Sequence, residues 1–173
     1  MKLIGIAGVA GSGKDTVADF LKEHNNFKSV AFADPIRAGM RAMAGLKDKH
    51  FQHPTKEFIL PEFGKSPRQM MQTLGTEWAR NSVHQDFWLI IAGKEVDKIH
   101  KQAYNAAITD VRFENEAAWV RKNGGIIWHI RRGGAGTEHV HASEAGIAFV
   151  EGDEEIDNNG TLEDLYRQVV LYV

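Results

Sequence analysis

The chain has 173 residues, of which 43% are hydrophobic and 25% are charged, and its formal net charge is −2. This balance is typical of a single globular domain with a substantial core. The small net charge gives no reason to expect a nucleic-acid polymer as a partner, because no large positive field is available. The chain has no cysteine, which excludes disulfides and thiolate chemistry. No apolar run approaches the roughly 20 residues that span a bilayer, so we expect a cytoplasmic protein without a membrane partner.

An apolar run at residues 3–7 leads directly into a glycine-rich turn, Gly8-Val9-Ala10-Gly11-Ser12-Gly13-Lys14. The spacing fits the G-x4-G-K pattern of a loop that holds nucleoside triphosphates, and we prefer this interpretation to a turn without a ligand. Glycines let backbone N–H groups approach phosphate oxygens, the next helix adds its positive end, and Lys14 adds a mobile charge. The hydroxyl residue expected after the lysine is displaced to Thr16, as in the G-S-G-K-x-T of many nucleoside monophosphate kinases. The role of Asp15 stays open.

Up to residue 45 the pattern predicts a strand, a helix, a second strand and a second helix. The first strand is the apolar run at 3–7, and the apolar spacing over 16–23 indicates the first helix. Residues 27–32 form the next strand, and Asp34-Pro35 begins a helix that Gly45 ends, with Asp34 as a candidate cap. A strand–helix–strand unit of this kind implies a parallel sheet with a right-handed crossover.

Beyond residue 45 the pattern is first irregular and then alternates again between helices and strands. We expect residues 47–65 to be mostly irregular, with a short helix near 56–60. Helical spacing resumes at Ser66-Pro67, with Gly75 as a candidate break. The later elements are a helix over 86–101, a strand over 106–111, a helix over 114–122, a strand over 126–130, a short helix over 143–149, an edge strand over 154–157 and a helix from a capping box at 161–164 to residue 171.

These elements predict an α/β fold, with a mostly parallel sheet of about five strands flanked by helices on both faces. Ligands of such sheets bind beyond the carboxyl ends of the strands. The residues that follow the strands therefore form the candidate site, and they are 8–16, 34–37, 110–112 and 131–132. Each of these turns carries charge, which supports a site for a charged ligand.

Two acidic residues follow predicted strands. Asp110 stands where a triphosphate site needs an acid to hold Mg²⁺, and we favour this role over a cap for the next helix. Asp34 could align an acceptor or a metal-bound water, but a capping role would equally explain the Asp-Pro pair. Both roles of Asp34 stay open.

Six arginines are candidates for binding phosphate, because phosphoryl transfer is catalysed mostly by positioning and by neutralising spreading negative charge. Forked guanidinium groups suit this task, although a lone arginine is usually a solvated surface group. We expect three or four of the six to contact phosphate, first of all Arg112, Arg131 and Arg68. The six are Arg37, Arg68, Arg80, Arg112, Arg131 and Arg132.

Two further patterns carry weaker signals. His139 and His141 form an H-x-H pair, but without a third ligand we favour polar loop residues over a metal site. Trp78 and Trp88 could anchor the core or stack on a base, and the sequence does not separate these alternatives.

Five segments in the same order resemble the deoxynucleoside monophosphate kinases of bacteriophages, which have the P-loop kinase fold. They span nearly the whole chain and are Gly8–Thr16, Phe32–Pro35, Arg68–Arg80, Thr109–Glu116 and Ile156–Thr161. The L-G-T-E-W and D-V-R-F-x-N-E stretches within them are far more specific than the phosphate loop alone.

The resemblance implies transfer of the γ-phosphoryl group of ATP to a deoxynucleoside monophosphate, with Mg²⁺ as the metal. Lys14 would contact the transferred group, and Thr16 and Asp110 would serve the metal. The family's catalytic roles would fall on Lys14, Asp34, Arg112 and Arg131. The ATP-binding residues implied are Gly11, Ser12, Gly13, Lys14, Asp15, Thr16, Arg132, Asn158 and Gly160, with Asn158–Gly160 against adenine.

The same resemblance implies an acceptor region at residues 37–100 and a lid at 131–145, as insertions in one domain over 1–173. Arg68 would grip the acceptor phosphate, and Gln72 or Glu77 would lie near the base or sugar. The acceptor-binding residues implied are Arg37, Arg68, Gln72, Glu77, Arg80 and Trp88. From the resemblance alone we also expect a homodimer, with contacts near Trp78 and Trp88.

The nearest rivals are other small P-loop kinases, resembling dephospho-coenzyme A kinase or phosphomevalonate kinase, which would need a different acceptor pocket. A guanine-dependent switch is disfavoured, because we find no Asn-Lys-x-Asp stretch. A nucleotide-binding protein without catalytic activity is the alternative from another class.

Overall fold

The computed structural model describes residues 1–135 and 146–173 and divides into two compact units. The first unit joins residues 1–31 to residues 92–173, and the second is residues 32–91. The predicted lid lies largely outside the described residues, as do His139 and His141.

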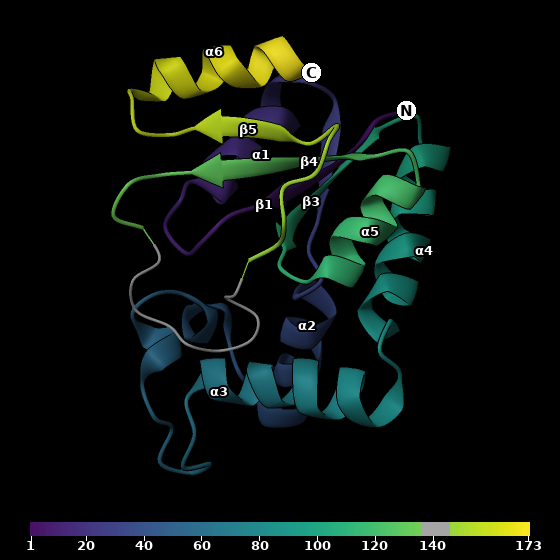
Figure 1. Ribbon diagram of the computed structural model, residues 1–173. Helices are drawn as coiled ribbons and strands as arrows, with labels where there is room; N and C mark the ends of the chain where they lie inside the picture. The colour runs from purple at the N-terminus through teal and green to yellow at the C-terminus, as the bar shows by residue number, and fades with distance from the viewer. Residues whose placement is uncertain (136–145) are drawn as a thin grey trace. The chain divides into compact units, whose positions relative to one another are not determined.

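The first unit is built on a five-stranded sheet in which every pairing is parallel (Figure 1). The strands in chain order are β1 (Leu3–Ala7), β2 (Phe27–Val30), β3 (Asn105–Val111), β4 (Ile126–Arg131) and β5 (Glu154–Asp157). Their order across the sheet is β2-β3-β1-β4-β5, so β5 is an edge strand as predicted. The chain leaves β1 to one side and returns past it to β4 on the other. The order thus reverses at β1, and the carboxyl end of this central strand is where a ligand of such a sheet is expected.

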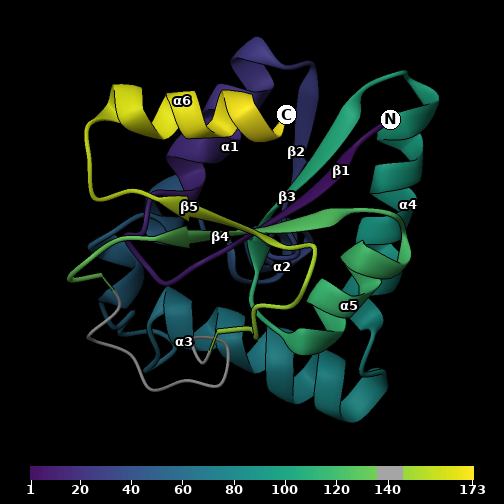
Figure 2. The same cartoon turned by 45° about the horizontal axis from the view of Figure 1, so that its top comes forward.

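Helices cover both faces of this sheet, as the two views show (Figures 1 and 2). α1 (Lys14–His24) and α6 (Leu162–Tyr172) lie on one face. α5 (Glu114–Lys122) lies on the other face, beside the part of α4 (Phe87–Lys101) that belongs to this unit. The predicted α/β fold with helices on both faces is therefore confirmed.

Alternation along the strands divides the core between the two faces. Ile4 and Ile6 of β1, with Trp128 and Ile130 of β4, are buried with α1 and α6. The alternate residues of these strands, such as Gly5 and Ile127, face α5, and the Ile127 side chain packs against Gly5. A run of five buried residues in β1 is what a strand covered on both faces requires.

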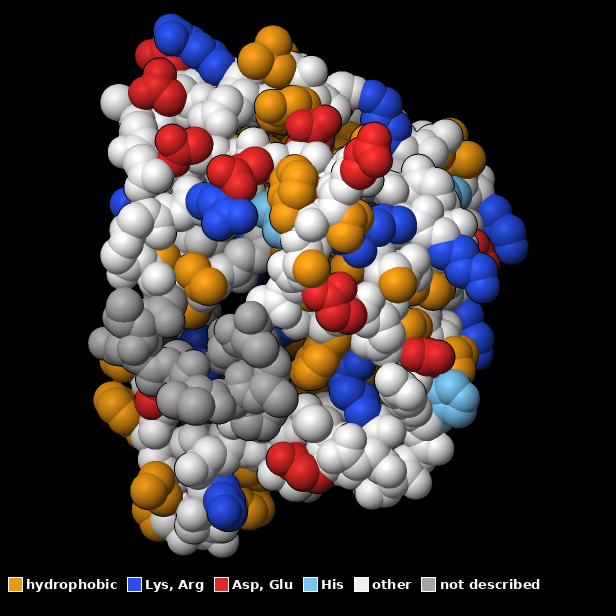
Figure 3. Space-filling model, viewed as in Figure 1, with side chains coloured by type: hydrophobic (Ala, Val, Ile, Leu, Met, Phe, Trp, Pro, Cys, Tyr) orange, Lys and Arg blue, Asp and Glu red, His pale blue; other side chains and the backbone are white. Residues whose placement is uncertain are grey.

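The outer surface of the first unit is mixed in character. In the upper part of Figure 3, acidic and basic side chains are interspersed with hydrophobic ones. The exposed apolar residues of α6 include Leu162, Val170 and Leu171. Within the described ranges, no helix is long and apolar enough to cross a bilayer.

The second unit consists of helices and short turns. They are α2 (Asp34–Ala44), the 3₁₀ turns η1 (Asp48–Phe51) and η2 (Thr55–Glu57), α3 (Pro67–Gln72), the π-helix η3 (Thr73–Val83) and the start of α4. Ser66 caps α3 in a capping box with Gln69, and Gly45 ends α2 with a φ of 66°. Both ends agree with the sequence prediction, since Ser66-Pro67 and Gly45 are local signals.

Three local predictions are corrected. Asp34 is not the N-cap of α2, because Ala33 occupies that position and Asp34 is the first residue of the helix. Gly75 does not break its helix, because η3 continues through it with the wider π spacing. Residues 146–149, the described part of the expected helix over 143–149, are not helical.

Candidate active site

The loop after β1 presents backbone N–H groups at the start of α1. Gly11 and Gly13 have φ values of 77° and 101°, which is the left-handed region that glycine tolerates. Gly13 is the N-cap of α1, and no described side chain caps this helix. The first-turn N–H groups are therefore not satisfied by a cap, and together with the helix dipole they favour an anion.

Lys14 adds a full positive charge to this loop. Its Nζ donates hydrogen bonds of 2.7 Å to the carbonyl oxygens of Gly8 and Val9. These bonds hold the ammonium at the loop. A phosphate at the loop would provide a stronger, charge-assisted partner.

The inner side of the loop is tightly packed. Ser12 is fully buried, and its Oγ has no hydrogen-bond partner within residues 1–135 and 146–173. A Cβ on Gly8 would lie 2.6 Å from the Ile130 carbonyl oxygen, which leaves no space for a side chain there. The uncapped helix, the ammonium of Lys14 and the orphaned Ser12 hydroxyl together fit a polyphosphate.

Two candidate metal residues lie on different elements. Thr16 is half-buried in the first turn of α1, whereas Asp15 is exposed there, where its charge suits the helix dipole. Asp110 is half-buried in β3, at a point where the pairing with β1 is irregular. Residues 5 and 7 of β1 pair with residues 108 and 111, so β3 has one extra residue between these pairs. Such bulges are frequent beside active sites, where they re-aim a side chain.

Asp110 does not cap the following helix. The helix α5 begins after Phe113, whose N–H donates to Glu116 Oε2 at 3.0 Å. The N–H of Arg112 donates to the same oxygen at 2.7 Å, and Glu116 is buried. The capping alternative for Asp110 is therefore wrong, since the N-cap is Phe113 and Glu116 accepts the hydrogen bonds of the backbone N–H groups before α5.

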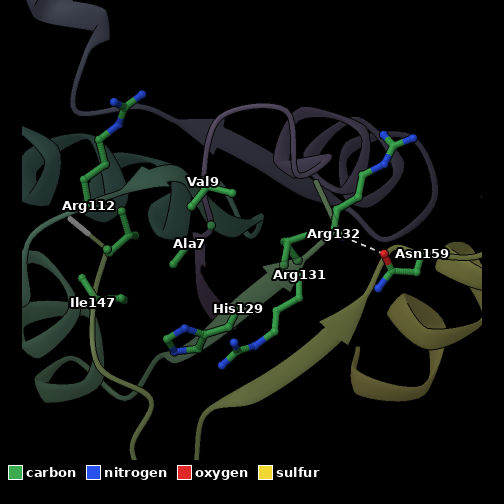
Figure 4. A pocket seen from close by; sticks show the side chains of 13 residues that line it. Ala7, Val9, Arg112, His129, Arg131, Arg132, Ile147 and Asn159 are labelled. Carbon is green, nitrogen blue, oxygen red and sulfur yellow. Dashed lines mark hydrogen bonds between the residues drawn. The ribbon is translucent and has the colours of Figure 1, made fainter. Parts of the chain in front are cut away.

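A cavity of about 430 Å³ opens beyond the carboxyl ends of β1, β3 and β4 (Figure 4). Three of the predicted phosphate-binding arginines, Arg112, Arg131 and Arg132, line it. Arg131 also forms an ion pair with Glu155 of the neighbouring strand β5, and its side chain is 61% exposed. The structure thus brings three of the six candidate arginines to one cavity.

The cavity wall contains a cluster that the sequence did not indicate. His129 lines the cavity, and its Nε2 lies 3.0 Å from Asp153 Oδ2. The Asp153 carboxylate also accepts hydrogen bonds from Arg121, at 2.9 Å from Nε and 2.6 Å from Nη2, and from the N–H of Val150 at 3.0 Å. A carboxylate is an acceptor only, so His129 Nε2 is the atom that carries the hydrogen.

This cluster fixes the segment that closes one side of the cavity. Arg121 Nη2 donates to the Ala148 carbonyl at 3.3 Å, and the Ala148 N–H donates to Glu114 Oε1 at 2.6 Å. Burial alone would raise the pKa of Asp153, but the hydrogen bonds from Arg121, Val150 and His129 outweigh it and lower the pKa. The carboxylate is therefore stabilised in its charged form.

The segment after β5 contacts the phosphate loop. Asn158 Nδ2 donates to the Ser12 carbonyl at 2.8 Å, and Asn159 Oδ1 accepts from the Gly133 N–H at 2.7 Å. Gly160 is exposed before α6. The contact of this segment with adenine stays a prediction, and its contact with the phosphate loop has no signal in the local sequence.

Two of the candidate arginines of the second unit are paired with carboxylates. Arg37 Nη1 lies 2.9 Å from Asp34 Oδ1, and Arg68 Nη1 lies 3.0 Å from Glu57 Oε1. Arg80 and Gln72 are half-buried, and Glu77 is exposed. The partners Asp34 and Glu57 hold these guanidinium groups in place in the unit as described.

Trp88 is an anchor of the second unit. Its side chain is buried, and its Nε1 donates a 2.8 Å hydrogen bond to the Gly75 carbonyl of η3. Phe87 packs edge-on against it, with ring centroids 4.8 Å apart. This placement favours the core alternative for Trp88, whereas Trp78 is 48% exposed.

Comparison with known proteins connects this arrangement to one family. The sequence model of the family described as deoxynucleotide monophosphate kinase matches residues 47–169. The deoxynucleoside-5′-monophosphate kinase of Escherichia phage T5 is 46% identical over 69% of this chain and 72% of its own length. The deoxynucleotide monophosphate kinase of Enterobacteria phage T4 is 24% identical over 98% of this chain and 97% of its own. A provisionally named deoxynucleotide monophosphate kinase of Acanthamoeba polyphaga mimivirus is 29% identical over 98% and 95%.

Solved structures share the fold at low sequence identity. An unliganded sugar kinase from Janibacter superposes with a TM-score of 0.53 and 14% identity, over 99% of this chain and 94% of its own. The protein TT1252 from Thermus thermophilus superposes with a TM-score of 0.55 and 18% identity, over 99% and 95%. At such identities the likeness concerns the fold alone.

Proposed function

Because the chain belongs to the deoxynucleotide monophosphate kinase family, we propose that it transfers the γ-phosphoryl group of ATP to a deoxynucleoside monophosphate. The products are ADP and the deoxynucleoside diphosphate. The observation that carries this proposal is the phosphate loop, where an uncapped helix start, a lysine and a buried orphan hydroxyl meet. Those features suit a polyphosphate donor, and membership of the family indicates the class of acceptor.

The donor phosphates would lie at the loop and at the first turn of α1. Lys14 would exchange its bonds to the Gly8 and Val9 carbonyls for the transferred phosphoryl group. This exchange concentrates positive charge where negative charge spreads in the transition state. Arg112, Arg131 and Arg132 at the nearby cavity would add guanidinium groups for the same purpose.

Mg²⁺ fits Thr16 and Asp110, which supply the oxygen ligands that this ion prefers. When bound, the ion would neutralise negative charge on the phosphates. Thr16 would present its hydroxyl from the first turn of α1, and Asp110 would act from the bulge of β3, directly or through water.

The acceptor would bind to the second unit. Arg68 is the first candidate for its phosphate, because Glu57 already holds the guanidinium and the side chain is 16% exposed. Arg37 and Arg80 are further cationic candidates, with Gln72 and Glu77 for the sugar or base. We leave Trp88 out of this set, because its ring is packed in the core and its N–H is used by Gly75.

An acceptor screen tests the proposal. The enzyme is incubated with ATP and Mg²⁺ and with each common nucleoside monophosphate, in its deoxy and ribo forms, and both ADP and the diphosphate are measured. Dephospho-coenzyme A and phosphomevalonate serve as acceptors of the rival kinases. We expect turnover with at least one deoxynucleoside monophosphate. Turnover with none of them, or ATP binding without any phosphorylated product, contradicts the proposal.

A further inference from the structure

Asn158 joins two parts of the donor region that are far apart in the sequence. Its side-chain amide donates to the Ser12 carbonyl at 2.8 Å, and its backbone N–H donates to the Arg131 carbonyl at 2.8 Å. The next residue, Asn159, accepts a hydrogen bond from the Gly133 N–H at 2.7 Å. One short segment thus holds both the phosphate loop and the end of β4, from which Arg131 and Arg132 extend.

This segment is itself anchored from behind. Gln168 of α6 exchanges two hydrogen bonds with the backbone of Asp157, of 2.9 Å and 2.8 Å. Asp157 Oδ1 in turn accepts from the backbone and side-chain amides of Asn159, at 3.0 Å and 2.5 Å. Asn158 therefore acts from a fixed base rather than from a free loop end.

The contact between Asn158 and the loop fixes one particular peptide. In a planar trans peptide the C=O and the following N–H point in opposite directions. By holding the Ser12 carbonyl, Asn158 therefore also sets the direction of the Gly13 N–H. Glycine tolerates both orientations of its preceding peptide, so the chain alone would not select one of them.

The packing at Gly13 shows how close this contact is. A Cβ built on Gly13 would collide with the Asn158 amide nitrogen. The amide thus lies against the residue that caps α1, directly before Lys14. A side chain in this position is able to control the geometry of the loop without contacting the transferred group.

We propose that Asn158 is a positioning residue of the donor site, which selects the phosphate-binding orientation of the Ser12–Gly13 peptide and ties the loop to the end of β4. This inference rests on the proposed function, because it assigns the loop to the donor phosphates. Preorganised N–H groups bind phosphate without first having to be ordered, so loss of the contact weakens phosphate binding and slows transfer. The base of the nucleotide plays no part in this role.

The test uses Asn158→Ala and Asn158→Asp in the full-length enzyme. Each variant is assayed for kcat, for KM of ATP and of the acceptor, and for inhibition against ATP by two probes, inorganic tripolyphosphate and adenosine. One hydrogen bond of this kind corresponds to about a 5- to 10-fold change in affinity, so Asn158→Ala should weaken the binding of ATP and of tripolyphosphate by that factor. Asn158→Asp should lose more, because a carboxylate cannot donate to the Ser12 carbonyl and repels phosphate. Adenosine inhibition and the KM of the acceptor should not change.

Gln168→Ala is the matched control, since it loosens the same segment from the α6 side and leaves the Asn158 amide in place. It should lower the melting temperature about as much as Asn158→Ala, with a clearly smaller loss in donor kinetics, because the Asn158 amide is still present. The inference is overturned if Asn158→Ala keeps the wild-type KM of ATP and the wild-type inhibition constant of tripolyphosphate. It is also overturned if Asn158→Ala weakens inhibition by adenosine instead, or if Gln168→Ala shows the same loss in donor kinetics as Asn158→Ala. Failure of the proposed function is a separate result, since it would show in the wild-type enzyme as no turnover of any deoxynucleoside monophosphate.

Discussion

The phosphate loop and the arginines of residues 32–91 hold positive charge in different ways. At the loop, the Lys14 ammonium donates hydrogen bonds to two backbone carbonyls of the loop itself. In the second unit, Arg37, Arg41 and Arg68 each contact a carboxylate. The loop thus positions its cation through its own backbone, whereas the arginines of the second unit are positioned by acidic side chains.

This difference separates two ways of building a phosphate site. The loop is made by backbone geometry, with glycines and a helix start, and one mobile cation completes it. The second unit uses side chains that their acidic partners orient in advance, and Arg68 with Glu57 is less exposed than Arg37 with Asp34. Among these pairs we therefore expect the Arg68 contact to matter most, because exposed ion pairs contribute little.

The largest effect should come from Lys14→Ala, which removes the cation of the loop. We expect kcat to fall by about 10²- to 10³-fold, because a preorganised group that stabilises transition-state charge contributes on that order. Steady-state kinetics with ATP and the best acceptor measure the change, and circular dichroism checks the fold. Near-normal turnover in a folded variant would exclude Lys14 from the transferred phosphoryl group.

A smaller effect is expected for Arg68→Gln, which tests the second unit. Loss of a charge-assisted hydrogen bond should raise the KM of the acceptor about 10- to 100-fold, with little change in the KM of ATP. Arg41→Gln is the control, because Arg41 pairs with Asp48 in the same manner at a half-exposed position. Equal effects of the two substitutions would show that Arg68 has no special place among the paired arginines.

The smallest effect on turnover is expected for Asp153→Asn, which tests the wall beside the loop. The variant should lose about 2 kcal/mol of unfolding free energy at pH 7, because bonds to a charged carboxylate become neutral ones. The pKa of Asp153 is lowered below its ordinary value of 3.8, so its contribution is complete above that value and is lost as the pH falls through the lowered pKa. Urea unfolding at pH 7 and at pH 3 should therefore show that the difference in unfolding free energy between wild type and variant is smaller at pH 3. An equal difference in unfolding free energy at both pH values would exclude the carboxylate charge as its source.

The parts of the site that follow from local sequence were predictable. The loop of residues 8–16 is a contiguous pattern, and the strands around it show their burial as apolar runs. The capping box at Thr161 and Asp164 is likewise a short-range signal that the structure contains. In each case the interacting groups lie within a few residues, so their spacing carries the information.

The rest depends on contacts between distant residues. Arg121, His129 and Asp153 meet only because β4, α5 and the segment before β5 are adjacent in space, and no spacing marks them. The adenine contact predicted for Asn158 stays a prediction, but its amide also holds a carbonyl that lies 146 residues away in sequence, and no spacing indicates this contact. Gly75 was expected to break a helix, but the π-helix continues through it and the Trp88 N–H bonds to its carbonyl. Side chains that bridge elements override what the local pattern suggests.

The central place of β1 also affects the order in which the protein is made. β1 is synthesised well before its partners β3 and β4, which begin at residues 105 and 126, and the Lys2 N–H bonds to a side chain 103 residues later. Pairings over such separations close slowly and cannot form while the later strands are still in the ribosome. The phosphate loop therefore stays unsupported until β3 and β4 have been made, and Asn158 reaches it later still. Nucleotide binding should thus be acquired late and together with the whole sheet, so that ATP stabilises finished chains and not nascent ones.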